Sequence, residues 1–208
     1  MRIRQAGPDD ASAVASVHVR SWQVAIAGLV PQHYLDAMDP SHEESGWKSR
    51  IAATQWPSSG VLVAETEAGI VGFASFSASE ESSATAEIGT LYAMPEVWGA
   101  GIGKQLTAAA LTTLGQADYA QAVLWVLEDN ERALRFYEAG GPAAASDRSR
   151  RGNGSRARAV LSARRTWETS DRVGMGRSGT PLHHTSGGRR SGGTPWGGRD
   201  VPVARRGS

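Results

Sequence analysis

The segment from Glu87 to Lys104 constrains the fold most, because a glycine-rich turn there joins a strand-like run to a helical pattern. Pro95 breaks the strand pattern, and a Gly-x-Gly-x-Gly run begins at position 99. Such a turn places free backbone N–H groups at a helix N-terminus, where phosphate groups bind. The segment lacks Gly-x-x-x-x-Gly-Lys-[Ser/Thr], and residues 94–98 separate the strand too far from the glycines for a dinucleotide fold.

Hydrophobic periodicity over the first 141 residues predicts a mixed α/β fold. Alternating patterns predict strands over residues 2–4, 61–65, 70–77, 86–93 and 122–127. Helical patterns predict helices that begin at residues 8, 31, 41, 103 and 130, the third of them with a capping box at Ser41. Two strand–helix units therefore follow a short antiparallel meander.

The composition excludes several classes of protein. The 208 residues include no cysteine, so disulfides and thiolate metal sites are excluded, and the histidine spacings match no metal motif. The N-terminus lacks the pattern of a secretion signal, and no window approaches the roughly 20 apolar residues of a membrane helix. We expect a cytoplasmic protein without a metal or a membrane partner.

Several segments in one order resemble the GNAT superfamily of N-acetyltransferases. They are the opening Ile3–Asp10, the His18–Trp22 region, Ile70–Phe73, the glycine-rich turn and Glu128–Tyr137. The resemblance covers residues 1–141 and implies one acetyl-CoA-dependent N-acetyltransferase domain, with a mixed, mostly antiparallel sheet flanked by helices.

The resemblance also implies how acetyl-CoA, the co-substrate, is held. The strand is expected to part from its neighbour so that its backbone groups bind the pantetheine arm, while the turn binds the pyrophosphate. Trp98 departs from the Gln or Arg of many family members. The expected cofactor-binding residues are Leu91, Tyr92, Ala93, Trp98, Gly99, Ala100, Gly101, Ile102, Gly103, Lys104 and Asn130.

Two residues are candidates for proton transfer. Tyr137 lies seven residues after Asn130, about two turns along one helix face, and its phenol suits protonation of a thiolate leaving group. Glu87 is the candidate base, and strand alternation would place it on the same side as Leu91. Tyr137 could instead be a core residue beside its neighbour Phe136, and Glu87 could pair with an arginine at position 20 or 50.

The chain departs from the family after Gly141. No paired strand pattern follows, so we expect the last strands of the sheet to be missing and residues 142–208 to be a disordered tail. Residues 1–141 carry 8 basic and 17 acidic residues, a net charge of −9, whereas the tail carries 14 arginines and four acids, a net charge of +10. A nucleic-acid-binding extension, a plain disordered tail and a reading-frame shift all remain open, and 14 arginines without a lysine favour the last.

These patterns predict acetyl transfer from acetyl-CoA to a primary amine of a small molecule, protein or peptide, by direct attack in a ternary complex. The alternative is a non-catalytic or degenerate CoA-binding domain whose basic tail adheres non-specifically to nucleic acid. The acceptor amine is unidentified, and a homodimer is left open.

Overall fold

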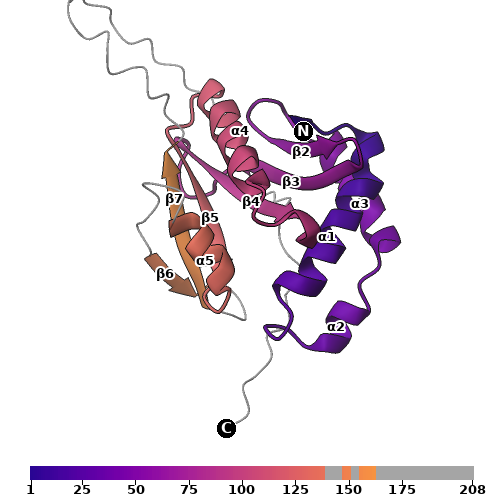
Figure 1. Cartoon of the computed structure of the whole chain (residues 1–208). Coiled ribbons are helices and arrows are strands. Elements are labelled where there is room, and N and C mark those ends of the chain that lie inside the picture. Colours follow the sequence, from indigo (N-terminus) through magenta and orange to yellow (C-terminus); the bar gives the residue numbers. More distant parts are fainter. Residues whose placement is uncertain (139–146, 151–154, 163–208) are drawn as a thin grey trace, which may run out of the picture.

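The computed structural model describes residues 1–138, 147–150 and 155–162, and Figure 1 shows their arrangement. In chain order the elements are β1 Arg2–Gln5, the 3-10 helix η1 Pro8–Asp10, α1 Ala11–Ala25, α2 Gln32–Asp36, α3 Pro40–Ala52, β2 Gly60–Thr66, β3 Gly69–Ala78, β4 Thr85–Ala93, the 3-10 helix η2 Pro95–Val97, α4 Ile102–Gln116, β5 Gln121–Leu127, α5 Glu131–Glu138, β6 Asp147–Arg150 and β7 Ser155–Ser162.

The described strands form one sheet in the order β1-β2-β3-β4-β5-β7-β6. β4 and β5 are parallel, and the other neighbouring strands are antiparallel. Helix α4 makes the crossover between the two parallel strands, as such a connection requires. The prediction of a mixed, mostly antiparallel sheet flanked by helices is confirmed.

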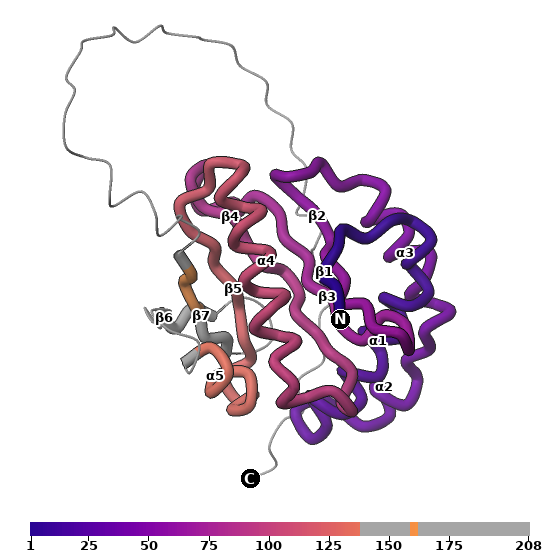
Figure 2. The backbone as a smooth tube through the Cα atoms, turned by 45° about the horizontal axis from the view of Figure 1, so that its top comes forward, coloured from indigo at the N-terminus to yellow at the C-terminus, as the bar shows by residue number. Residues whose placement is uncertain are grey.

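Strand alternation divides the core between the two faces of the sheet. Val61 and Val63 of β2 join a cluster with α1 and α3, whereas Leu62 and Ala64 join a cluster with α4. Figure 2 shows α4 lying across the sheet, with α1, α2 and α3 grouped together away from α5. The result is a three-layer arrangement of helices, sheet and helices.

The start of α3 follows local capping chemistry and corrects one expectation. α3 begins at Pro40, with Asp39 as its N-cap, and the Asp39 carboxylate accepts a hydrogen bond from the Ser41 amide at 2.8 Å. The expected capping box at Ser41 is therefore wrong, because the preceding aspartate and the proline at the first helical position already define the start.

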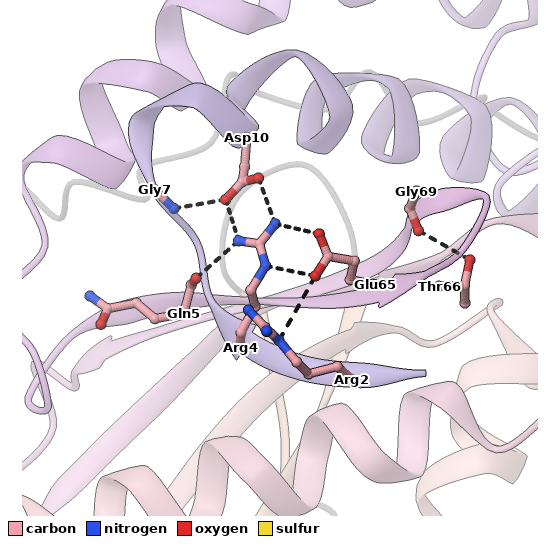
Figure 3. A network of polar contacts seen from close by, with 8 residues as sticks. All are labelled: Arg2, Arg4, Gln5, Gly7, Asp10, Glu65, Thr66 and Gly69. Atoms are coloured by element: carbon pink, nitrogen blue, oxygen red, sulfur yellow. Dashed lines mark hydrogen bonds and ion pairs between the residues drawn. The ribbon is translucent and has the colours of Figure 1, made fainter.

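A network of ion pairs ties the first strand to the start of α1 and to β2 (Figure 3). The Arg4 guanidinium contacts the Asp10 carboxylate at 2.7 Å and the Glu65 carboxylate at 2.9 Å. Asp10 also accepts a hydrogen bond from the Gly7 amide. The hydrogen bond from Arg4, followed by that from Gly7, lowers the pKa of Asp10. The network thereby fixes the edge of the sheet that contains β1.

The expectation that the last strands are missing is wrong. β7 pairs antiparallel with β5 along its whole length, from Gln121↔Ser162 to Leu127↔Arg156, and β6 pairs with β7. Arginine- and alanine-rich sequence has little intrinsic strand preference, but β5 offers an apolar edge, and Leu161 is buried beside it. The surrounding sheet therefore decides the conformation of this segment. Most of the expected disordered tail, including residues 163–208, lies outside the described residues.

Candidate functional site

The parallel strands β4 and β5 separate partway along their length. They pair at Thr85↔Gln121, Ala86↔Ala122 and Glu87↔Val123, after which β4 continues to Ala93 beside β3 alone. The residues expected to contact pantetheine lie on this separated stretch: Leu91, Tyr92 and Ala93. Backbone groups on the β5 side of β4 therefore lack a partner strand there.

A β-bulge at Gly89 changes which side chains of β4 share a face. Thr90 pairs with Ser75, whereas Ile88 pairs with Phe76, so Gly89 has no partner on β3. The extra residue inverts the alternation. Glu87, Thr90 and Tyr92 consequently share the face toward α1, while Leu91 joins the cluster beneath α4. The expectation that Glu87 faces the same side as Leu91 is wrong for this reason.

Tyr92 belongs to a cluster of rings on the α1 side. The His18 ring stacks on it with centroids 5.5 Å apart, and Trp22 and Phe73 meet it at 6.4 and 5.7 Å. Trp47 Nε1 donates to His18 Nδ1 at 3.3 Å, so a neutral His18 carries its proton on Nε2. The Trp22 indole N–H is buried without a partner among the described residues.

Tyr137 packs on the face of the sheet opposite to that of Tyr92. The centroid of its ring lies 5.0 Å from that of the Phe136 ring, and the side chain packs against the α4-side cluster. This packing agrees with the alternative in which Tyr137 is a core residue beside Phe136. Burial, and to a smaller extent the nearby Tyr92, raise the pKa of Tyr137 well above that of a free phenol. The hydroxyl therefore stays protonated at neutral pH, as a proton donor must.

Asn130 caps α5 and does not lie within it. Its side-chain oxygen accepts a hydrogen bond from the Ala133 amide at 3.1 Å, and the helix begins at Glu131. The expected helix start at residue 130 is corrected by one position, since the cap itself lies outside the helix. Among the described residues the side-chain NH₂ group of Asn130 has no acceptor, so its donors are open to a ligand.

The glycine-rich turn has the backbone geometry that its glycines predict, with one exception. Gly99 and Gly101 have φ of +86° and +80°, values that favour glycine, and Ala100 between them is exposed. Gly103 has no positive φ. A Cβ there would instead lie 3.1 Å from the Phe136 ring, so its small size lets α5 approach α4.

The start of α4 presents free amides. Among the described residues, the N–H groups of Ile102, Gly103 and Lys104 have no backbone acceptor, and the first helical bond runs from Gln105 N to Gly101 O. Three successive donors at a helix N-terminus can hold an anion.

The carbonyl of Ala93 joins the two halves of the site. It accepts hydrogen bonds from Ser21 Oγ at 2.9 Å and from Trp98 Nε1 at 2.8 Å. Both lone pairs of this oxygen are thus used, so Ala93 cannot also accept from pantetheine through its carbonyl. Sequence reasoning missed the role of Ser21, although a serine on the inward face of an amphipathic helix was the available signal.

The arginines that could have paired with Glu87 have other partners. Arg20 forms an ion pair with Glu96, and the Arg50 guanidinium carbon lies 5.1 Å from the centroid of the Trp47 ring. The alternative in which either arginine pairs with Glu87 is therefore not realised. Glu87 lies at the last paired position of β4 with β5, where the two strands begin to separate.

Comparisons with known proteins identify the family. Residues 29–141 match the Acetyltransferase (GNAT) family. The chain is 34% identical over 143 residues to the uncharacterized N-acetyltransferase YuaI of Bacillus subtilis, a match that covers 67% of this chain and 79% of the relative. An uncharacterized N-acetyltransferase of Archaeoglobus fulgidus is also 34% identical, over 66% of this chain and 89% of the relative.

Solved structures share the fold. The PaiA N-acetyltransferase of Thermoplasma acidophilum, in complex with coenzyme A, superposes with a TM-score of 0.63 at 19% identity, over 77% of this chain and 98% of that one. The structure of YncA of Salmonella typhimurium with acetyl-CoA superposes with a TM-score of 0.58 at 18% identity. The match covers 79% of this chain and 95% of that one. The chain therefore belongs to the GNAT family of acetyltransferases. Its enzyme class is that of an acyl-CoA-dependent N-acetyltransferase.

No helix in the part of the chain that the structure describes is long and apolar enough to cross a membrane. No group of three or more histidine, cysteine, aspartate or glutamate residues there could hold a metal ion.

Proposed function

We propose that this chain transfers an acetyl group from acetyl-CoA to a primary amine by direct attack in a ternary complex. The observation that carries the proposal is the separation of β4 from β5 after Glu87, together with the free amides at the start of α4. A thioester placed between these strands would have a protonated phenol on one side and the ring cluster of α1 and β4 on the other.

Acetyl-CoA would be held at two places. The free amides at the start of α4 suit its diphosphate. The backbone of Leu91 and the amide of Ala93 face away from β3 and suit the amide groups of its pantetheine arm, with Asn130 as a further donor. The neighbours that contain coenzyme A or acetyl-CoA share this fold and support acetyl-CoA as the co-substrate.

Tyr137 would act as the general acid. The amine nitrogen attacks the thioester carbonyl carbon, the C–S bond breaks, and the departing thiolate takes the phenolic proton. The raised pKa of Tyr137 keeps this proton in place at neutral pH but also makes the phenol a weaker acid, so its transfer depends on the negative charge that develops on the departing sulfur at the same buried position.

Glu87 would accept the amine proton. Its position at the end of the β4–β5 pairing, on the same face as Tyr92, puts it on the side from which an acceptor held by the α1 cluster would approach. The distance along β4 from Glu87 to Tyr92 favours transfer through an intervening water molecule over direct contact.

Thermal unfolding with and without acetyl-CoA, together with release of free thiol in the presence of a panel of amines, tests the proposal. A ligand at 100 times its Kd should stabilise the chain by about 2.7 kcal/mol. Stabilisation with thiol release that depends on the amine supports transfer. Stabilisation without thiol release for any amine would favour the non-catalytic alternative, and no stabilisation would contradict a formed cofactor site.

A further inference from the structure

An arginine of α5 lies directly over the indole of the cofactor turn. The Arg132 guanidinium carbon is 3.5 Å from the centroid of the Trp98 ring, which is the separation of groups stacked in contact. The indole is itself fixed, because its N–H donates to the Ala93 carbonyl at the end of β4. The Trp98 indole, held in place by this hydrogen bond, therefore positions the Arg132 guanidinium between β4 and α5.

The charge of Arg132 is not compensated, in contrast to other arginines of the domain. Arg4, Arg20 and Arg135 each form an ion pair with a carboxylate, whereas Arg132 forms none with any described residue. Its side chain keeps an exposed surface. Partial burial, followed by the charge of Arg135, lowers its pKa, so a nearby anion would stabilise the charged form.

Arg132 also lies on the helix face that meets the start of α4. Phe136, four residues further along α5, shares that face and packs so closely on Gly103 that a Cβ there would lie 3.1 Å from its ring. The guanidinium is consequently on the side of α5 toward the free amides of Ile102, Gly103 and Lys104. A cation and a set of aligned N–H donors together favour a doubly charged anion.

We propose that Arg132, held on the Trp98 ring, binds the diphosphate of acetyl-CoA together with the N-terminus of α4. This inference rests on the proposed function, because it assigns one contact of the same cofactor. The planar guanidinium can stack on the indole and still direct its N–H edge at phosphate oxygens. Trp98 then acts by positioning the arginine.

Titration calorimetry of the full chain with CoA and with dephospho-CoA, which lacks the 3′-phosphate and keeps the diphosphate, tests the proposal. Arg132→Gln should weaken binding of both ligands equally, by roughly 10- to 100-fold, the loss of a charge-assisted contact. The matched control is Arg135→Gln on the same helix. It removes the same charge from an arginine paired with Glu131 at the surface and should change Kd less than about threefold.

Two further variants separate binding from folding. Arg132→Lys keeps the charge without the planar stack and should give an intermediate Kd, and Trp98→Leu should weaken binding although it leaves the charge in place. Thermal unfolding without ligand checks that all variants fold as the wild type does.

Equal affinities of Arg132→Gln and Arg135→Gln would overturn the inference while leaving wild-type CoA binding, and the proposed function, in place. A loss confined to CoA would assign Arg132 to the 3′-phosphate and contradict the diphosphate contact. A wild-type chain that binds neither ligand would instead contradict the proposed function, and the Arg132 assignment with it.

Discussion

The two faces of the sheet are packed in different ways. Beneath α4 the core is mostly aliphatic, with Leu106, Ala110 and Leu114 against small and branched residues of the strands and Phe76 as its one fully buried ring among the described residues. Toward α1 and α3 it is built of rings, in which Trp47 and Phe73 meet edge to face at 4.9 Å. The aliphatic face offers few groups that can bind through hydrogen bonds, whereas the ring face includes several.

The difference indicates a division of labour across the sheet. Close aliphatic packing sets the position of α4 and thereby of the amides that precede its first turn. The ring face contains the polar groups nearest the separated strands, among them His18, Ser21 and the Ser75–Thr90 hydroxyl pair at 2.6 Å. We infer that one face holds the cofactor and the other selects the acceptor.

The largest effect is expected where the two faces meet. Tyr137→Phe keeps the packing and removes the proton, so turnover should fall by about 10²- to 10⁴-fold with little change in acetyl-CoA affinity. The control is Tyr119→Phe, another partly buried tyrosine beside the α4-side cluster, which should turn over normally. Steady-state kinetics and a separate Kd measurement check both. Normal turnover of Tyr137→Phe would leave only the core interpretation of this residue.

Truncations on each face should separate stability from cofactor binding. Leu106 and Trp47 are both fully buried, so Leu106→Ala should lower the free energy of unfolding by about 2–5 kcal/mol and Trp47→Ala by about 3–5 kcal/mol. Only Leu106→Ala should also weaken acetyl-CoA binding, because α4 presents the amides. Denaturant unfolding gives the free energy of unfolding of each variant, and titration calorimetry gives its Kd for acetyl-CoA. A comparable loss of affinity in Trp47→Ala would end the distinction between the faces.

A smaller effect is expected in the turn that serves the cofactor side. Gly101 has φ of +80°, so Gly101→Ala should cost about 1–2 kcal/mol and weaken acetyl-CoA binding. Gly46, inside α3 with open space around its Cβ position, is the matched control, and Gly46→Ala should raise stability by about 0.5–1 kcal/mol. Unchanged acetyl-CoA affinity in Gly101→Ala would contradict the assignment of this turn to the cofactor.

The smallest effect comes from Asp10, which belongs to neither face. Its pKa is lowered in the folded chain, so its contribution is present above the ordinary aspartate range and is lost as pH falls through the folded pKa. Asp10→Asn should remove about 1 kcal/mol at neutral pH and flatten the loss of stability in acid. Unfolding curves of the wild type and of Asp10→Asn, from pH 7 down to about pH 3, measure this difference in the free energy of unfolding. A cofactor affinity that follows the same pH profile would show that the sheet edge is coupled to the site.

The sequence predicted the order of the elements through α5 because periodicity and glycines report on the backbone locally. The glycines at positions 99 and 101 also marked the turn in which the structure has left-handed backbone. The bulge at Gly89 was beyond reach, since an inserted residue is defined only by the pairing of two strands. The same holds for β7, whose conformation depends on the edge that β5 offers.

The contacts of single side chains were the least predictable. Asn130 was expected to contact the cofactor, and no pattern distinguishes that role from the helix cap that the structure contains. The stack of Arg132 on Trp98 joins positions 34 residues apart, so it follows from the packing of α5 and from no local signal. A reading-frame shift after Gly141 stays a prediction that the coding DNA can test, and in the structure β7 covers the edge of β5.

The carbonyl oxygen of Ala93 accepts two hydrogen bonds, and this restricts how the site can vary in evolution. An acceptor on the backbone cannot be mutated away, because every residue at position 93 provides the same carbonyl. Only its donors, Ser21 on α1 and the indole at position 98, can change. A replacement at either donor leaves a vacant lone pair that water or the other donor must fill. Substitutions at positions 21 and 98 should therefore be inherited together, which links the evolution of acceptor choice to that of the cofactor turn.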